Sequence, residues 1–149
     1  MKRPVFAVIL FALLFTSSAF AAEGVKWQTL TEGMAKAKAE KKPVIVDFFF
    51  GKGCPRCEFL DKEIYHNPAI AKKIMDDFVP IRIDLTKKLS AEEQSLGEKY
   101  DFKNDCLLLF LDREGKLVKE GSKRLCFIDK VDPEEFMRYL DAAKSVVIK

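Results

Sequence analysis

Two cysteines three positions apart, Cys54 and Cys57, follow a strongly apolar segment, and this pair constrains the chain more than any other feature. A disulfide between them would close almost no loop, so it would remove little entropy from the unfolded chain and would be a poor structural staple. The apolar segment, Val44–Phe50, has the composition of a strand buried on both faces, and Gly51-Lys52-Gly53 interrupts it. The spacing therefore indicates chemistry at the end of a buried strand.

The N-terminal segment has the three parts of a secretory signal peptide. Basic residues 2–3 precede an apolar stretch at residues 5–15, and small residues at 17–22 provide a cleavage site. The apolar stretch is too short to span a bilayer comfortably, although an uncleaved N-terminal anchor is the alternative. We expect a signal peptide over residues 1–22 and one exported, periplasmic domain over residues 23–149.

The charge balance argues against several kinds of partner. The chain has 26 Lys and Arg against 23 Asp and Glu, a formal net charge of +3. Cleavage of the signal peptide removes two basic residues and no acid, so the charge falls from +3 to +1. This balance gives no reason to expect a nucleic acid or an anionic membrane surface as a partner. We expect a monomer.

Helices alternate with strands along the rest of the chain. The expected strands are Val25–Gln28, Val44–Phe50, Phe78–Leu85, Cys106–Leu111 and Lys116–Gly121. The expected helices begin after Thr31, at the cysteine pair, at Asn67-Pro68, at the capping box Ser90-Ala91-Glu92-Glu93 and at Asp132-Pro133. A turn at Asp112–Gly115 would place Leu111 opposite Lys116. The order predicts an α/β fold with a mixed central sheet flanked by helices on both faces, which is the order of the thioredoxin fold.

A C-x-x-C pair at the start of a helix is suited to thiol–disulfide exchange. The first sulfur faces unpaired N–H groups and the positive end of the helix dipole, while the second thiol can resolve a mixed disulfide. We therefore expect Cys54 to attack and Cys57 to resolve, with Lys52 and Arg56 adding positive charge. An inert disulfide or half of a zinc site is the alternative. A four-ligand zinc site needs a second clustered ligand pair, which the sequence lacks, so no metal or cofactor is expected.

Residues 46–57 resemble the strand, loop and active-site turn of thioredoxin-like proteins. Residues 58–63 and 67–70 are closer to one branch, which includes the C-terminal domain of the periplasmic reductase DsbD and related small exported thioredoxins. Residues 108–115 and 132–136 resemble the closing hairpin and last helix of that branch. The resemblance implies a thioredoxin fold and dithiol–disulfide exchange with cysteine-containing exported proteins. It also implies a membrane electron donor or acceptor of the DsbD type.

The resemblance further implies the residues of the site, with three departures from the family pattern. Asp47 matches the buried acid that assists the resolving thiol, but the loop that follows is one residue longer, and an acid merely tolerated on the strand is the alternative. Gly53 replaces the aromatic residue before the first cysteine. Cys106 holds the place of the family's cis-proline. Substrate contacts are expected from five residues: Gly53, Pro55, Arg56, Asp105 and Cys106.

Two further cysteines, Cys106 and Cys126, form a possible second thiol pair. The expected hairpin would bring both toward the end of the sheet that holds the active site. A bond between them would close a loop of about twenty residues and stabilise the fold by roughly 3 kcal/mol. Cys106 could instead be a small buried apolar residue, or could join Cys54 and Cys57 as a third thiolate for copper, zinc or an iron–sulfur unit. A metal or iron–sulfur carrier and a non-catalytic binding module are thus the alternatives to an oxidoreductase.

Overall fold

The computed structural model describes residues 24–102, 108–118 and 132–147, and its centre is a three-stranded sheet. Strand β1 (Val44–Phe49) lies between β2 (Val79–Asp84) and β3 (Leu108–Leu111). β1 is parallel to β2 and antiparallel to β3, and in this register Asp47 lies opposite both Arg82 on β2 and Leu108 on β3. The mixed sheet expected from the sequence is confirmed.

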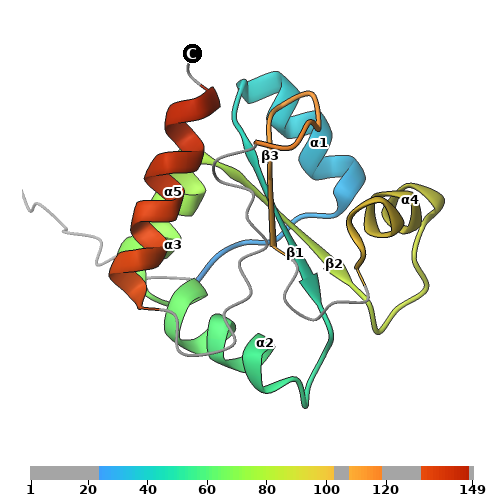
Figure 1. The fold of residues 1–149 in the computed structure, drawn as a ribbon, viewed down its shortest axis with the longest axis horizontal. Coiled ribbons are helices and arrows are strands. Elements are labelled where there is room, and N and C mark those ends of the chain that lie inside the picture. The colour runs from blue at the N-terminus through green and yellow to red at the C-terminus, as the bar shows by residue number, and fades with distance from the viewer. Residues whose placement is uncertain (1–23, 103–107, 119–131, 148–149) are drawn as a thin grey trace, which may run out of the picture.

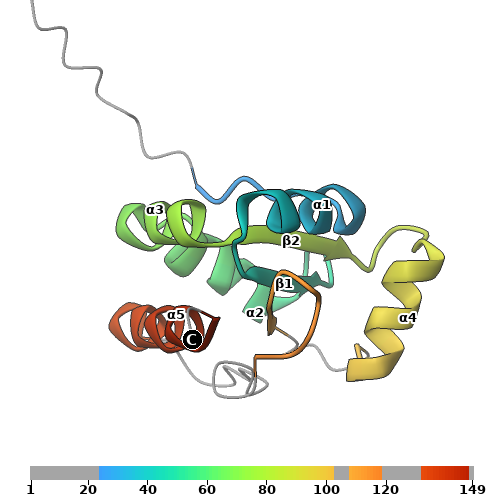
Figure 2. The same cartoon turned by 90° about the horizontal axis from the view of Figure 1, so that it is seen from above.

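Helices cover both faces of the sheet (Figure 1). They are α1 (Leu30–Glu40), α2 (Pro55–Phe59), the π-helical turn η1 (Leu60–Tyr65), α3 (Pro68–Asp77), α4 (Ala91–Tyr100) and α5 (Pro133–Val147). Helices α3 and α5 lie on one side and α1 and α4 on the other, while α2 lies beyond the end of β1. Figure 2 shows α4 and α5 at opposite ends of the molecule. The start of α2 therefore lies beyond the C-terminal end of the central strand.

Alternation of side chains along β1 divides the core into two clusters. Val44, Val46 and Phe48 pack in the cluster beside α1. Ile45 packs in the cluster with η1, α3 and α5, and Asp47 occupies the same face of the strand. All five side chains are buried, so the prediction of a strand buried on both faces is confirmed.

Two predictions for the N-terminal part of the chain are wrong. Val25–Gln28 makes only a single parallel bridge to the sheet, in which Gln28 pairs with Ile81. To extend this bridge into a strand toward the N-terminus, the backbone of residue 80 would have to donate a hydrogen bond, and Pro80 has no N–H. Helix α1 is capped by Thr29, not Thr31, because the Thr29 side chain accepts a hydrogen bond from a backbone N–H of the first turn.

The turn after β3 is one residue longer than expected. Leu111 pairs with Leu117, whereas the sequence predicted Lys116. The backbone N–H of Asp112 donates to the carbonyl of Lys116 at 2.8 Å, and Gly115 adopts a φ of +80°. With Gly115 in this left-handed conformation the loop between Leu111 and its partner has five residues, so the partner is Leu117 and not Lys116. The remainder of the expected second hairpin strand lies outside the described residues.

The other predicted helix starts are confirmed. The Asn67 side chain accepts hydrogen bonds from two backbone N–H groups at the start of α3. Ser90 and Glu93 form a reciprocal capping box before α4. Helix α5 begins at Pro133, as expected.

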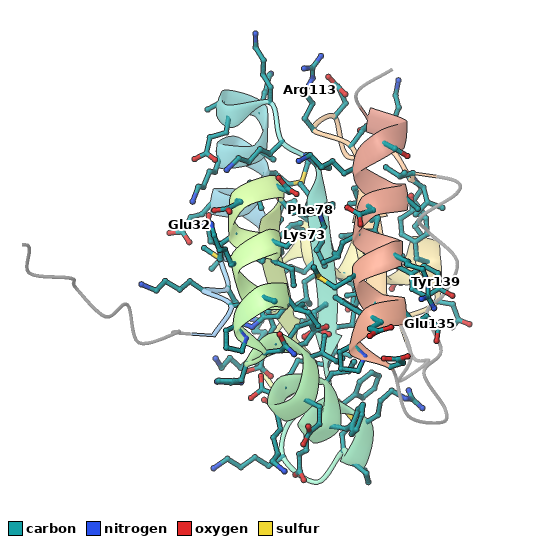
Figure 3. All side chains as sticks on the ribbon, turned by 90° about the vertical axis from the view of Figure 1, so that its left-hand side faces the viewer. Glu32, Lys73, Phe78, Arg113, Glu135 and Tyr139 are labelled. Carbon is teal, nitrogen blue, oxygen red and sulfur yellow. A yellow bond between two sulfur atoms is a disulfide. The ribbon has the colours of Figure 1, made fainter. Side chains whose placement is uncertain are left out.

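Ion pairs join α3 to α5, which lie side by side in Figure 3, where Lys73 is labelled. Lys73 Nζ lies 3.3 Å from Asp77 Oδ2 and 2.6 Å from Asp141 Oδ1. Lys144 Nζ of α5 donates to Asp77 Oδ1 at 2.6 Å. Burial raises the pKa of Asp77, but hydrogen bonds from Lys144 and Lys73 outweigh it and leave this pKa below its usual 3.8. The ionised form of Asp77 therefore helps to dock α5.

We expect Asp77→Asn to lower the free energy of unfolding by about 1 kcal/mol at pH 7, because it removes the charge that two lysines share. A carboxyl whose pKa is lowered by folding contributes stability above its unfolded pKa and loses it as pH falls through the folded value. The deficit should thus be full at neutral pH and shrink as the pH falls below 3.8. Urea unfolding of both proteins across this range measures it, and a deficit that persists in acid would contradict the assignment.

Candidate active site

The cysteine pair lies at the start of α2, beyond the end of β1. Cys54 is the N-cap of the helix, with an extended backbone (φ −92°, ψ 102°), and Pro55 is the first helical residue. The two sulfurs form a disulfide, with the Cα atoms of Cys54 and Cys57 5.2 Å apart. The pair therefore occupies the helix N-terminus that the sequence predicted.

The two cysteines differ in their exposure. Cys54 is half-buried, whereas Cys57 is only 7% exposed. The backbone N–H of Cys57 donates to Cys54 Sγ at 3.2 Å. In the reduced protein this N–H and the helix dipole would favour negative charge on Cys54. Of these two cysteines, Cys54 is the one that is both accessible and placed to be stabilised as a thiolate, which supports its assignment as the attacking residue.

The loop before Cys54 explains why the family's aromatic residue is absent. Gly53 has a φ of +91°, a conformation that L side chains rarely adopt, and its N–H donates to Glu58 Oε1 at 2.9 Å. Gly51 has a φ of +88° and is buried against Thr86, which a Cβ on Gly51 would strike. The extra loop residue is thus accommodated by two glycines in the left-handed region.

The remaining predicted site residues fall into two groups. Pro55 and Gly53 are exposed beside Cys54, and Arg56 is half-buried in the first turn of α2. Asp105 and Cys106 lie outside the described residues, as does Cys126. The predicted substrate contacts at Asp105 and Cys106, and the possible Cys106–Cys126 pair, therefore stay predictions.

Asp47 is the buried centre of a hydrogen-bond network that joins β1, β2 and η1. Its residue exposure is 6%. Arg82 Nε donates to Asp47 Oδ2 at 2.8 Å, and the Tyr65 hydroxyl donates to Asp47 Oδ1 at 3.4 Å. Both terminal nitrogens of Arg82 also lie 3.3 Å from Asp61 Oδ1. Asp61 is four residues beyond Cys57, on the π-helical turn η1 that continues α2, so the network reaches the helical segment that follows the cysteine pair.

Burial controls the protonation of this network. It raises the pKa of the Asp47 carboxyl, and this effect exceeds the opposing influence of the Arg82 charge and of the hydrogen bonds from Arg82 and Tyr65. Burial, together with the charge of Asp47, raises the pKa of Tyr65 well above its usual 10.0, so the phenol remains a donor. Asp47 is buried, as the resemblance implied for this acid.

Within the described parts of the chain, no three or more His, Cys, Asp and Glu side chains gather to hold a metal ion. No helix among those residues is long and apolar enough to cross a membrane.

The sequence around this site resembles that of known proteins. Residues 26–107, more than half of the chain, match a family described as thioredoxin-like. The chain belongs to the thioredoxin-like family. The matched stretch includes β1, the cysteine pair and β2. The fold and the position of the disulfide are therefore those of a thioredoxin-like domain.

Two curated relatives of this thioredoxin-like chain are both named thiol:disulfide interchange protein DsbD. They come from Vibrio vulnificus strains CMCP6 and YJ016, and each is 32% identical over 69 residues. The match covers 46% of this chain but 11% of each relative, so this chain spans a small part of the length of DsbD.

Solved structures share the thioredoxin-like fold. A DsbH oxidoreductase has a TM-score of 0.66 and 17% identity, covering 89% of this chain and 92% of its own. A thioredoxin from Thermus thermophilus has a TM-score of 0.62 and 20% identity, with 80% and 86% covered. A putative disulphide-isomerase from Bacteroides thetaiotaomicron has a TM-score of 0.57 and 25% identity, with 84% and 94% covered.

The partners of Asp47 were not predicted from the sequence. Arg82 is a lone cation between two buried isoleucines on β2, and such a residue usually needs a partner. Asp47 is a lone acid on β1, the other long apolar run. Matching these two opposite charges on neighbouring strands would have predicted the pair. No comparable signal identified Tyr65 or Asp61, whose placement depends on the π-helical turn.

Proposed function

We propose that this protein is a thiol–disulfide oxidoreductase that exchanges the Cys54–Cys57 pair with disulfides of exported proteins. The observation that carries the proposal is a half-exposed Cys54 at the N-cap of α2, bonded to a buried Cys57. An inert staple needs no such asymmetry, whereas exchange needs one accessible sulfur and one sheltered sulfur.

In the reducing direction, the Cys54 thiolate attacks one sulfur of a substrate disulfide. A mixed disulfide forms and the other substrate sulfur leaves as a thiolate, which takes up a proton. Cys57 then gives its proton to Asp47, and its sulfur attacks Cys54 Sγ. The Cys54–Cys57 bond forms and the second substrate thiolate leaves. The substrate disulfide is reduced by two electrons and the protein dithiol is oxidised by the same two.

We expect Asp47→Asn to slow resolution of the mixed disulfide by roughly 10²-fold, because an amide cannot accept the Cys57 proton. Rapid mixing of reduced protein with a fluorescent disulfide separates this step from the first attack by Cys54, which should be little changed. Thermal unfolding of the same variant serves as the control. If turnover is unaffected and only stability changes, Asp47 has no part in the chemistry.

The proposed function is tested by reduction of insulin disulfides with dithiothreitol. The reduced protein should accelerate insulin precipitation above the dithiothreitol background, whereas protein alkylated with iodoacetamide should not. Equilibration with glutathione buffers gives the reduction potential of the Cys54–Cys57 couple and hence the favoured direction of electron flow. No acceleration, together with a pair that glutathione neither oxidises nor reduces, would contradict the proposal.

We further propose that the protein is exported to the periplasm as a single domain over residues 23–149. The signal-like composition of residues 1–22 supports this, and the similarity to part of DsbD supports a membrane electron donor or acceptor of that type. Mass measurement of protein from an osmotic-shock fraction tests cleavage at residue 22. A full-length mass in the membrane fraction would contradict it.

A further inference from the structure

A single guanidinium serves two carboxylates beside the active site. Arg82, on β2, donates through Nε to Asp47 on β1 and through both terminal nitrogens to Asp61 on η1. Its side chain is only 18% exposed. The Asp47 side chain is 9% exposed and that of Asp61 is 40% exposed, so the charge of Asp61 acts on Asp47 through a guanidinium that is only partly screened by water.

Aromatic rings fix this guanidinium in place. The Arg82 guanidinium carbon lies 4.2 Å from the ring centre of Trp27, 4.8 Å from that of Phe49 and 5.5 Å from that of Tyr65. A planar guanidinium can stack on such rings and still donate in its own plane. Arg82 is thus held where its donors are divided between Asp47 and Asp61.

The π-helical turn η1 supplies Tyr65 and Asp61, the two residues that contact the Asp47–Arg82 ion pair. Tyr65 is 1% exposed, and its ring makes an edge contact with Trp27 at 4.8 Å. The N–H of His66 donates to the carbonyl of Asp61 five residues earlier, which widens the turn. Asp61 therefore faces Arg82 while Tyr65 reaches Asp47 from the same turn.

We propose that Tyr65 and Asp61 are positioning residues that set, in opposite directions, the affinity of Asp47 for the proton that the proposed reaction takes from Cys57. Tyr65 donates to one carboxylate oxygen and stabilises the ionised form of Asp47. Asp61 withdraws donors of Arg82 from Asp47 and adds a second negative charge, which destabilises that form. The inference rests on the proposed function only in naming Cys57 as the source of the proton.

In the described part of the chain, the charged and titratable groups that act on Asp47 are Arg82, Tyr65 and Asp61. Arg82 faces it from β2, and Tyr65 and Asp61 face it from η1. Its partner in register on β3, Leu108, is apolar. Exposed His66 lies next to Asp61, with its Nδ1 3.7 Å from Asp61 Oδ2, and its own titration is followed separately.

The test is a carbon-detected NMR titration of the Asp47 carboxyl in the oxidised protein and in two near-isosteric variants. The pKa of Asp47 should rise in Tyr65→Phe and fall in Asp61→Asn. On the acid limb of the pH–rate profile, resolution should slow about threefold in Tyr65→Phe and quicken about twofold in Asp61→Asn, since Asp61 is the more exposed. Asp76→Asn, which changes an exposed acid paired with Lys72 on α3, is the matched control and should move neither quantity.

Shifts of the same sign in both variants, or none in either, would overturn the inference even if disulfide reduction is normal. A rise in Tyr65→Phe together with a fall in Asp61→Asn supports it, and the reverse pair of shifts would also overturn it. If the carboxyl titration moves as expected but the rate profile does not follow, the proton-accepting role of Asp47 is wrong while the two positioning roles stand. Near-ultraviolet circular dichroism checks that each variant keeps the packing of Trp27, and Tyr65→Leu, which likewise lacks the donor, replaces Tyr65→Phe if the latter does not fold.

Discussion

Replacing Cys57 with serine is expected to trap the protein in mixed disulfides with its substrates and to reduce turnover to the uncatalysed background. The half-exposed Cys54 can still attack a substrate disulfide, because the backbone N–H of residue 57 that faces its sulfur is retained. The hydroxyl that replaces the Cys57 thiol cannot complete the exchange, so the first covalent product persists. Non-reducing electrophoresis followed by mass spectrometry of the linked peptides measures the trapped species.

The matched control is Cys54→Ser. Cys57 is 7% exposed, so a substrate disulfide should not reach its sulfur, and this variant should trap no more than the alkylated protein does. Both variants lose the same disulfide, so a difference in trapping cannot come from lost stability alone. Trapping through Cys57 in the Cys54→Ser protein would reverse the assignment of attacking and resolving residues.

The main elements of the fold could be predicted because local composition and the fold agree at those positions. The apolar run at Val44–Phe50 becomes the central strand with both faces buried. The capping box at Ser90 starts α4 where expected. Apolar periodicity and side-chain caps act over a few residues, so a single sequence is enough to read them.

Details that depend on contacts between distant segments could not be predicted in the same way. The π-helical turn at Leu60–Tyr65 has ordinary helical spacing in the sequence. In the wider turn, Asp61 contacts Arg82 on β2 and Tyr65 contacts Asp47 on β1. The cap at Thr29 is different, because the carboxylate of Glu32, three residues later, is a helix-start signal that a single sequence contains.

The site was predicted unevenly for the same reason. The cysteine pair and Asp47 are marked by local sequence, namely a C-x-x-C at a strand end and an acid within an apolar run. Arg82 is 35 positions from Asp47, and only the strand register brings the two together. Residues whose role is electrostatic support are therefore harder to identify than residues that carry the reacting atoms.

Arg82→Met is expected to lower the free energy of unfolding by about 3–5 kcal/mol at neutral pH, the usual cost of leaving a buried charge without its partner. Methionine preserves much of the side-chain length but donates no hydrogen bond, so among the described side chains ionised Asp47 would keep the Tyr65 hydroxyl as its donor. Arg113→Met, on the exposed turn after β3, is the matched control and should change stability little.

The pH dependence of the Arg82→Met deficit identifies its cause. Without Arg82, burial should raise the pKa of Asp47 further, so the native variant would hold a proton that the unfolded chain releases near the usual 3.8. A carboxyl whose pKa is raised by folding costs stability as pH rises from the unfolded value to the folded one, and the deficit should therefore shrink on acidification toward pH 4. The double variant Asp47→Leu/Arg82→Met removes both charges and should recover most of the loss, as urea unfolding would measure. A deficit that is constant with pH and is not recovered in the double variant would mean that Arg82 stabilises the fold mainly by packing on Trp27 and Phe49.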